Sequence, residues 1–324
     1  MRIGKIQAYV GAVVLSALAL AAAPAQAQGW PQRTVKFILP LGPGAGADIS
    51  ARLFADRLAK RWGQSVVVEN RPGADGVVAI TAFISAGDDH TLLFGPSSSF
   101  VAHPYLHDKM PYDPAELSPI ARISNTLVGV AAPASLNVGS LADLMAMVRA
   151  QPGKLNWTTI TGVTDFIVAG FLKSDGLDMT RIPYRDTVQA LNDLAEQRIH
   201  LYVAALAIVR PQVQAGRVKL LAITNREQAP DAPDLPTVAD AGYPALSFDG
   251  LVGLFGPRQM ADDLRDRIAA DIRAVAEDPE IKARLTATGQ LVRPGTAAEF
   301  AAAINEQAAK LADFAKTLGV KPSQ

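Results

Sequence analysis

Cysteine is absent from this chain of 324 residues. The chain therefore forms no disulfide and carries no lipid on a cysteine. It also lacks a thiolate that could act as a nucleophile or bind a zinc ion or an iron–sulfur cluster. Disulfide scaffolds, cysteine hydrolases and cysteine-based metal sites are excluded from the start.

The formal net charge is zero, because 31 lysine and arginine residues balance 31 aspartate and glutamate residues. A nucleic-acid-binding surface needs an excess of basic side chains that displaces counterions. The sequence has no basic stripe, heptad pattern or repeat, so we expect no nucleic-acid partner. Its 49% hydrophobic content is that of a globular protein. At roughly 100–200 residues per domain, its length favours two domains.

Long hydrophobic runs are confined to the N-terminus. Arg2 and Lys5 precede the apolar run Val10 to Ala23, and Ala25-Gln26-Ala27 follows it. This order is typical of a secretory signal peptide, and the run is shorter than the about 20 residues of a membrane span. We expect residues 1–27 to be removed after Ala27, which leaves a periplasmic protein. An uncleaved membrane anchor is the alternative.

Strand and helix patterns alternate in the first half of the remaining chain. Thr34 to Pro40 has the pattern of a buried strand, and an amphipathic helix follows it. Further strands are predicted at Ser65 to Glu69 and Thr91 to Gly95. Asp48 is placed to cap the helix at its start, and Gly63 suits its end. Strand, helix and strand with short links are typical of a parallel sheet.

The second half continues this alternation and ends in helices. Strands are predicted at Leu127–Ala132, Leu155–Thr159, Ile199–Val203, Val218–Thr224 and Leu251–Phe255. Helices are predicted from a Ser140 cap to Arg149, at about Asp165–Lys173, at Asp186–Gln197, and three times near the C-terminus. The last helix opens with a capping box of Thr296 and Glu299. Phe300, Ile304, Leu311 and Leu318 mark its buried side. Two α/β lobes joined by crossing segments fit this order better than one long sheet.

The loop Pro43-Gly44-Ala45-Gly46-Ala47-Asp48 joins the first predicted strand to its helix. Its small side chains let the backbone approach a ligand closely, and its amides lie at a helix N-terminus, which favours an anion. The loop matches neither a Walker loop nor the G-x-G-x-x-G pattern. From the residues alone, it is either an anion-binding loop or a glycine-rich turn.

Two further strand–loop–helix junctions carry polar groups. Ser97, Ser98 and Ser99 follow the strand Thr91 to Gly95, at the sheet edge where open α/β sheets bind ligands. Their hydroxyls suit a carboxylate, although each serine could equally cap the next segment. In the junction Thr159 to Asp165, the loop offers amides and hydroxyls, and we expect Asp165 to cap the helix.

Several segments resemble the solute-binding receptors of tripartite tricarboxylate transporters, the Bug family. They are "ILPLGPGAGADISARLFADRL", "GQSVVVENRPGADG", "MPYDPAELSPIA", "QPGKLNW", "IPYRDTVQALNDL", "DLPTVADAGYP" and "DPEIKARLTATG". Each segment is short, but their order and spacing are specific, and together they cover essentially the whole mature chain.

This resemblance implies an α/β periplasmic binding-protein fold, type II-like, with two α/β lobes and a ligand cleft between them. Such receptors capture a small organic carboxylate and deliver it to the membrane permease subunits of a tripartite transporter. They typically hold the carboxylate by backbone amides, hydroxyls and ordered water instead of arginine. We therefore expect a monomeric binding protein, not an enzyme, with no cofactor and no metal. Lobe 1 is expected to comprise residues 28–126 and 249–324, and lobe 2 residues 127–248.

On this resemblance the glycine-rich loop is a carboxylate cradle. The predicted ligand-binding residues are Gly44, Ala45, Gly46, Ala47, Asp48, Ser97, Ser98, Ser99, Thr161, Gly162, Thr164 and Ala204. Ligand bound between the lobes should favour a closed form in proportion to its extra affinity for that form.

The chain departs from the family pattern at three positions. Ala204 and Ala205 stand where the family often has Asp and Asn or Ser, and Leu251 stands where it usually has tryptophan. Fewer polar groups leave fewer partners for a ligand amine or a second carboxylate. We therefore hypothesise an apolar carboxylate ligand, aromatic or aliphatic, over an amino acid. Arg71 is predicted to be structural, holding its turn through hydrogen bonds to carbonyl groups.

The main alternative is an exported hydrolase that pairs one of Ser97 to Ser99 with a histidine. The histidines are His90, His103, His107 and His200. No G-x-S-x-G motif occurs, and we expect the histidines to be surface residues. His103 and His107 are also spaced like a metal pair, but Pro104 disfavours a regular helix between them. A further alternative is a receptor that docks on a signalling protein, which the sequence does not distinguish from delivery to a permease.

Overall fold

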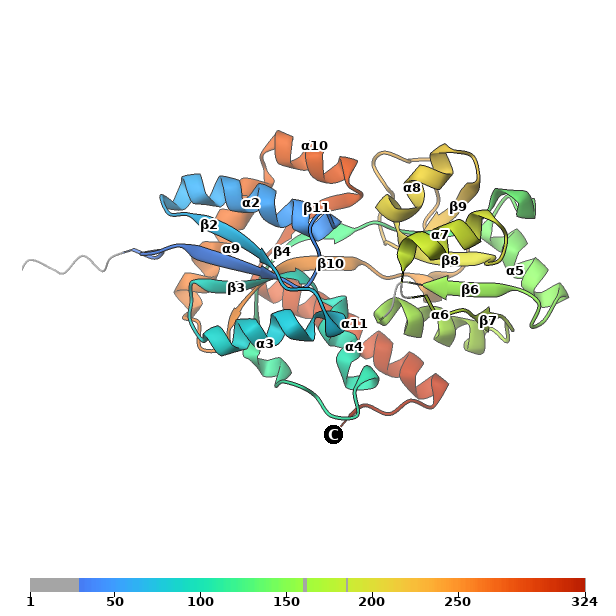
Figure 1. Ribbon diagram of the computed structural model, residues 1–324, viewed down its shortest axis with the longest axis horizontal. Coiled ribbons are helices and arrows are strands. Elements are labelled where there is room, and N and C mark those ends of the chain that lie inside the picture. Colours follow the sequence, from blue (N-terminus) through green and yellow to red (C-terminus); the bar gives the residue numbers. More distant parts are fainter. Residues whose placement is uncertain (1–28, 160–161, 185, 324) are drawn as a thin grey trace, which may run out of the picture.

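Residues 29–159, 162–184 and 186–323 are described by the computed structural model of the chain. In this part of the chain the strands form two separate sheets, and each sheet packs against helices on both faces. Figure 1 shows the two lobes side by side, with the C-terminal helix running across both. The predicted two-lobed α/β architecture is confirmed.

The first lobe is built on a six-stranded sheet. Its strands are β1 (Val35–Leu39), β2 (Val66–Asn70), β3 (Thr91–Pro96), β4 (Leu117–Thr126), β10 (Gly250–Pro257) and β11 (Gln290–Gly295). They lie in the order β11-β4-β10-β3-β1-β2. β1 is parallel to β2 and β3, whereas β10 and β11 run antiparallel to β4. The apolar runs of β1 and β3 are expected for strands that are covered on both faces.

Helices cover both faces of this sheet. They are α2 (Gly46–Trp62), α3 (Val77–Ala86), α4 (Ser98–Leu106), α9 (Asp262–Ala276), α10 (Pro279–Ala287) and α11 (Ala297–Leu318). α2, α9 and α10 bury one face, where Phe37, Phe54 and Ile272 are inaccessible to solvent. α3 and the start of α11 bury the other face, around Phe83 and Phe300.

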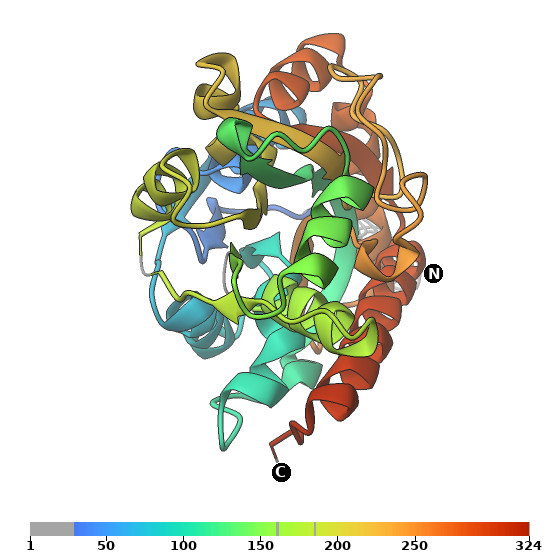
Figure 2. The same cartoon turned by 90° about the vertical axis from the view of Figure 1, so that its right-hand side faces the viewer.

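The second lobe has a five-stranded sheet. Its strands are β5 (Val128–Pro133), β6 (Asn156–Thr159), β7 (Thr180–Arg181), β8 (Leu201–Ala205) and β9 (Val218–Ile223), in the order β7-β6-β8-β5-β9. Its helices are α5 (Leu141–Ala150), α6 (Val163–Ser174), α7 (Thr187–Ala195) and α8 (Leu206–Gln214). α5 and α6 pack on one face of the sheet, and α7 and α8 pack on the other. Figure 2 views this lobe from its outer end.

The described chain crosses between the two sheets twice. The first crossing joins β4 to β5 through Leu127, and the second runs from the end of β9 to the start of β10. The predicted lobe boundaries, at 126/127 and 248/249, fall within these crossings. The exact boundaries stay a prediction.

The C-terminal helix α11 belongs to the cores of both lobes. Phe300, in its first turn, packs in the first lobe, whereas Leu311 and Ala315 are fully buried in the second lobe with Phe171 of α6. α6 and α11 approach so closely that a Cβ on Gly170 would lie 2.3 Å from a ring carbon of Phe314. The predicted division places all of 249–324 in lobe 1, but the apolar stripe of α11 continues past the first sheet and covers α6.

The predicted strands and helices have counterparts in the structure, with ends that differ by a few residues. The sequence patterns do not predict α3, α4, α8, β4, β7 or β11. β4 was hidden because Pro119, Arg122 and Asn125 interrupt its apolar pattern. The capping predictions hold at three helix ends: Gly63 ends α2 in a left-handed conformation, Ser140 accepts from Asp143 N, and Thr296 and Glu299 form a reciprocal capping box.

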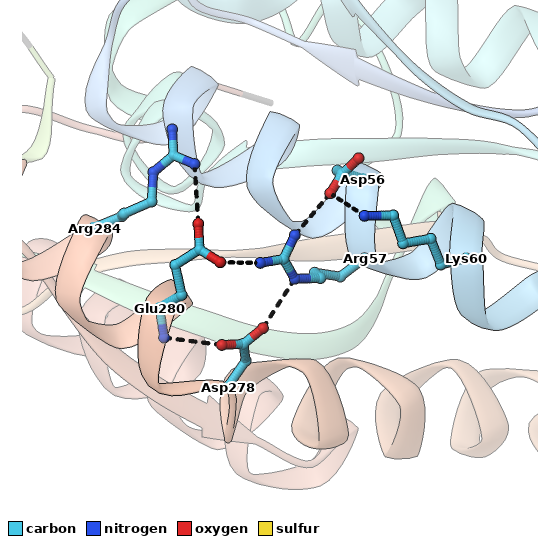
Figure 3. Close-up of polar contacts among 6 residues, drawn as sticks. All are labelled: Asp56, Arg57, Lys60, Asp278, Glu280 and Arg284. Atoms are coloured by element: carbon cyan, nitrogen blue, oxygen red, sulfur yellow. Dashed lines mark hydrogen bonds and ion pairs between the residues drawn. The ribbon is translucent and has the colours of Figure 1, made fainter.

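A network of ion pairs fastens α10 to α2 in the first lobe (Figure 3). Arg57 of α2 donates to Asp278, which lies 2.9 Å away and also caps α10, and it pairs with Glu280 in the first turn of α10. Arg57 also binds Asp56, which in turn contacts Lys60. The hydrogen bond from Arg57 is the main cause that lowers the pKa of Asp278.

Within residues 29–159, 162–184 and 186–323, no helix combines the length and the apolar character that crossing a membrane requires. The predicted signal peptide, residues 1–27, lies outside the described residues.

Candidate ligand-binding site

Four strand–helix junctions lie at the boundary between the lobes. In the first lobe β1 leads into α2 and β3 leads into α4; in the second lobe β6 leads into α6 and β8 leads into α8. Figure 1 shows the N-terminal ends of α2 and α6 at this boundary, on opposite lobes. The junctions of α4 and α6 are close, because a Cβ on Gly162 would lie 3.8 Å from Ser98 O. The carboxyl ends of parallel strands are where open α/β sheets bind ligands.

The four helices that begin at these junctions have no side-chain hydrogen bond at their N-caps. Their N-cap residues are Ala45, Ser97, Gly162 and Ala205. α5, α7, α10 and α11, which begin elsewhere, are capped by Ser, Asp, Asp and Thr side chains, whereas α3 and α9 are also uncapped. An uncapped first turn leaves N–H groups free for an outside acceptor, and the helix dipole favours an anion there.

The first junction presents backbone amides in this way. Gly44 adopts a left-handed conformation with φ of 85°, which suits glycine. Among the described residues, no acceptor is hydrogen-bonded to the amides of Gly46, Ala47 or Asp48. Ala45 is the N-cap, with extended backbone. The predicted cradle therefore has free donors at the start of α2.

Asp48 does not cap α2 in the predicted way. It lies in the first turn of the helix, and its buried carboxylate accepts from Gly44 N at 2.9 Å, Asn70 Nδ2 at 2.8 Å and Arg52 Nε at 3.1 Å. Burial alone would raise the pKa of Asp48, but these hydrogen bonds outweigh it and hold the pKa below its usual value. The Asp48 carboxylate thus holds the loop through these hydrogen bonds. Of Asp48, only the backbone amide remains for a ligand.

Residues from distant parts of the chain support this loop. Asn70 donates to Leu41 O as well as to Asp48, so β2 holds both ends of the loop. Gln290 of β11 lies directly beneath Gly46, where an added Cβ would be 2.6 Å from its Nε2. Gln290 is itself held by Ser124 Oγ at 3.1 Å. Asn70 stands out in the sequence as part of the segment "ENRPGADG", whereas no sequence pattern marks Gln290.

The serine junction is less open than predicted. Ser97 is fully buried, and its hydroxyl donates to Gln307 Oε1 of α11 at 3.1 Å. Its amide donates to Leu251 O at 2.9 Å. Ser98 is partly exposed, and the side chain of Ser99 lies outside the described part of the structure. Ser97 therefore positions the junction, and Ser98 is the described serine that a ligand could reach.

At the junction of α6, Thr161 lies outside the described residues. Gly162 is the N-cap, with φ of 86°, and Thr164 is partly exposed with no hydrogen-bond partner for its hydroxyl among the described residues. The prediction that Asp165 caps this helix is wrong. Its carboxylate accepts from Thr159 Oγ1 at 2.7 Å and pairs with Arg181, so it stabilises the end of β6.

The three positions that suggested an apolar ligand are mostly buried. Ala204 has no exposed surface and packs with the helices of the outer face of the second sheet. Leu251 is 2% exposed and packs with Phe83 and Phe300. Ala205 alone among them is partly exposed. In this conformation the side chains of Ala204 and Leu251 therefore do not reach a ligand.

The histidines do not form a catalytic or metal site in the described residues. Contrary to prediction, His90 and His103 are buried. His103 bonds Tyr112 Oη at 2.6 Å and Asp75 O at 3.1 Å, and burial lowers its pKa. No described histidine is hydrogen-bonded to a serine hydroxyl. Contrary to expectation, α4 continues through Pro104, and His103 and His107 lie at its C-terminal end.

One group in the described chain has the composition of a metal site: Asp88, Asp89 and His90. Both ring nitrogens of His90 already have partners, since Nδ1 lies 2.6 Å from Asp89 Oδ1 and Nε2 accepts from Gln32 N at 3.2 Å. Asp88 accepts from His90 N and pairs with Arg33. The group is satisfied internally and offers no free ligand set.

The turn that contains Arg71 differs from the prediction. Arg71 pairs with the carboxylate of Glu69 and not with carbonyl groups, and both side chains are substantially exposed. The Arg71 guanidinium therefore makes no described hydrogen bond to a carbonyl group, although the Arg71 backbone N–H donates to Leu39 O at 2.8 Å.

Comparison with known proteins gives consistent matches. A sequence model described as "Tripartite tricarboxylate transporter family receptor" matches residues 50–320. A UPF0065 protein of Bordetella bronchiseptica is 28% identical over 313 residues, which are 94% of this chain and 91% of that protein. Among solved structures, Rpa4515 of R. palustris with adipate has a TM-score of 0.78 at 28% identity, covering 91% of this chain and 100% of its own. MatC of Rhodopseudomonas palustris with bound malate has a TM-score of 0.72 at 28% identity. The match covers 88% of this chain and 99% of MatC.

Proposed function

Because the chain belongs to the tripartite tricarboxylate transporter receptor family, we propose that it is a periplasmic solute-binding protein for a small organic carboxylate. The ligand lies between the lobes, and the loaded protein delivers it to the membrane permease subunits of a tripartite transporter. The observation that carries the proposal is the set of four helix N-termini without side-chain caps at the boundary between the lobes. Free N–H groups at helix N-termini bind anions.

The ligand of this proposal is a carboxylate with an apolar body, aliphatic or aromatic. The described parts of the four junctions, residues 43–48, 97–100, 162–165 and 204–206, contain no lysine or arginine. A second carboxylate or a charged amine would find few charged partners there, whereas amides and hydroxyls suffice for one carboxylate. Adipate in the R. palustris relative has such an aliphatic body but carries a second carboxylate, while malate in MatC is a shorter diacid with a hydroxyl group.

A thermal-shift screen of the chain from Gln28 onward tests the ligand class. The panel is adipate, benzoate, malate, citrate and glutamate at neutral pH. A ligand at 100 times its dissociation constant adds about 2.7 kcal/mol to the stability of the folded state. Stabilisation by adipate or benzoate supports the proposal. Tighter binding of citrate or glutamate contradicts the apolar ligand but not the receptor, and no shift with any acid contradicts the carboxylate site.

The Thr164→Val substitution tests the site itself. It keeps the side-chain shape and removes a hydroxyl that has no partner within the described structure. Because a hydrogen bond to a charged group contributes about 1.5–3 kcal/mol, we expect the dissociation constant of the bound acid to rise about tenfold or more. Isothermal titration calorimetry measures this constant.

Thr317→Val near the C-terminal end of α11 is the control, because Thr317 is exposed and its hydroxyl donates within its own helix, to Asp313 O at 3.0 Å. Equal affinities of the two variants and the parent would remove Thr164 from the site.

A further inference from the structure

The serine junction is connected to the crossing segments by one glutamine. The side-chain oxygen of Gln307, on α11, accepts from Ser97 Oγ at 3.1 Å. Its side-chain nitrogen donates to Asp249 O, which lies on the second crossing. One planar amide therefore holds both the residue that begins α4 and the segment that joins the lobes.

The second crossing is tied to the first by a buried asparagine. Asn225 is fully buried, and its Oδ1 accepts from Val128 N at 2.9 Å while its Nδ2 donates to Thr126 O at 3.0 Å. Nδ2 also lies 3.3 Å from Asp249 Oδ1. The two crossings are thus linked by the side chains of Asn225 and Asp249.

Ser97 has little freedom of its own. Its side chain is buried, its hydroxyl is held by Gln307, and its amide is held by Leu251 O at 2.9 Å. Leu251 lies two residues after Asp249, at the start of β10. A displacement of the serine junction would therefore pull on the second crossing and on α11 at once.

α11 also contacts the second crossing at places that do not reach the serine junction. Lys310 Nζ donates to Ser247 O, and Arg226 pairs with Glu306. A cavity of about 80 Å³ adjoins these residues and Gln307, which leaves room for side chains to rearrange. Among the described contacts, Gln307 is distinct because it bridges α11, the crossing and the serine junction.

From these contacts we propose that Gln307 is a positioning residue that couples the serine junction to the rotation of the lobes. The inference rests on the proposed function, in which a carboxylate binds beside Ser98. When a ligand holds the junction, Gln307 transmits its position to Asp249, and Asn225 transmits it to the first crossing. Glutamine is required because the contact uses one acceptor and one donor on the same group.

The absence of cysteine makes this coupling accessible to distance measurement. Ser65→Cys before β2 and Ser174→Cys at the end of α6 place one exposed spin label on each lobe. Pulsed electron–electron double resonance then gives the distance distribution between the lobes, with and without adipate. The labelled parent is compared with Gln307→Leu, Gln307→Glu and Lys310→Met.

Both Gln307 variants should broaden the distribution of the unliganded protein and reduce the shift that adipate causes. Gln307→Glu keeps the acceptor for Ser97 but loses the donor to Asp249 O, so it should behave like Gln307→Leu. The dissociation constant of adipate should rise about tenfold in both, which corresponds to about 1.4 kcal/mol. Lys310→Met removes a contact to the crossing without touching the junction, and should keep the parent's shift.

The outcomes separate this inference from the proposed function. If Gln307 is merely structural, its variants melt at lower temperature while the distance distributions and the affinity stay as in the parent, and the coupling is overturned. If the parent binds no carboxylate, the proposed function fails. The distance distributions of the unliganded proteins still test the coupling by Gln307. A broader distribution in the Gln307 variants than in Lys310→Met supports the coupling, and equal distributions overturn it.

Discussion

Asp48 organises a loop whose other residues, apart from one proline, are glycine and alanine. Its carboxylate holds Gly44 N, Asn70 and Arg52, which leaves the first amides of α2 pointing away from any described acceptor. A negative side chain in the first turn of a helix also interacts favourably with the helix dipole. The Asp48 carboxylate holds the loop in place from within, and the outward-facing amides remain available to the anionic group of a ligand.

The substitution Asp48→Asn should destabilise the protein at neutral pH. The hydrogen bonds to the charged carboxylate are worth more than those to an amide, and we expect a loss of about 1.5–3 kcal/mol. Because the pKa of Asp48 is lowered in the folded state, its stabilisation is present above its usual pKa of about 4 and is lost as the pH falls through the folded-state value. Urea unfolding at pH 7 and at pH 3 should therefore show a smaller difference between variant and parent at pH 3.

Asp108→Asn is the control for this measurement, because Asp108 is exposed and takes part in no described hydrogen bond or ion pair. A difference between Asp48→Asn and the parent that is equally large at pH 3 would contradict the role given to the charge.

At the scale of single residues, the sequence predicted what is local. The small residues around Gly44 and the hydroxyl of Thr164 were proposed as candidate site residues because they follow strands and precede helices. Gln290 and Gln307 were not, because each reaches its junction from the far end of the chain and no local pattern marks it. The roles of Asp48 and Asp165 were wrong for the same reason: their partners, such as Asn70 and Arg181, lie on other elements.

Four of the six described α-helices that begin away from the junctions carry side-chain caps, whereas the four that begin at the junctions carry none. α5, α10 and α11 carry side-chain caps, and these could be predicted from Ser, Asp and Thr at the right distance from an apolar run. The helices at the junctions begin at Ala, Gly or a serine engaged elsewhere, and their free amides became evident only in the structure. β4 escaped prediction because Pro119, Arg122 and Asn125 interrupt its apolar pattern, and its pairing with β10 and β11 is seen only in the structure.

The substitution Gly170→Ala tests the close approach of α6 and α11. The added methyl group would lie 2.3 Å from a ring carbon of Phe314, so the two helices must separate or the ring must move. We expect a net loss of about 1–3 kcal/mol from overpacking, although alanine favours the helix by up to about 1 kcal/mol. Urea unfolding measures the change.

A double-mutant cycle with Phe314→Ala provides the control. Removing the ring opens space for the methyl group, so the double variant should be more stable than the sum of the single effects allows. Additive effects would show that the two helices do not meet at this point.

The whole molecule should unfold in one step, despite its two sheets. One hydrophobic cluster contains Val101 and Ala102 of α4, Phe171 of α6, and Leu311 and Ala315 of α11, so the second lobe's core includes parts of helices that begin in the first. Opening either lobe alone would expose this shared cluster to water. We therefore expect a single cooperative transition.

Tryptophan fluorescence can follow each lobe separately, because Trp30 and Trp62 lie in the first lobe and Trp157 lies in β6 of the second. In Trp157→Phe the fluorescence reports the first lobe, and in the Trp30→Phe, Trp62→Phe double variant it reports the second. In each variant the fluorescence and far-ultraviolet circular dichroism transitions should coincide. Separate midpoints for the two probes would contradict the shared core.

At this scale the sequence predicted two α/β lobes in the right order along the chain. It did not predict that α11 belongs to the cores of both lobes. Phe300, Leu311 and Leu318 mark the buried side of this helix, but they do not show which lobe covers that side. Only the three-dimensional position of α6 decides that.

The place of α11 at the end of the chain has a consequence for biogenesis. A polypeptide is synthesised from its N-terminus, so the second half of α11 is made after every described strand of both sheets. The strands of the second sheet, complete at Ile223, lack Leu311 and Ala315 until then. The core of the second lobe therefore becomes complete only after the chain has returned to the first lobe and supplied α11.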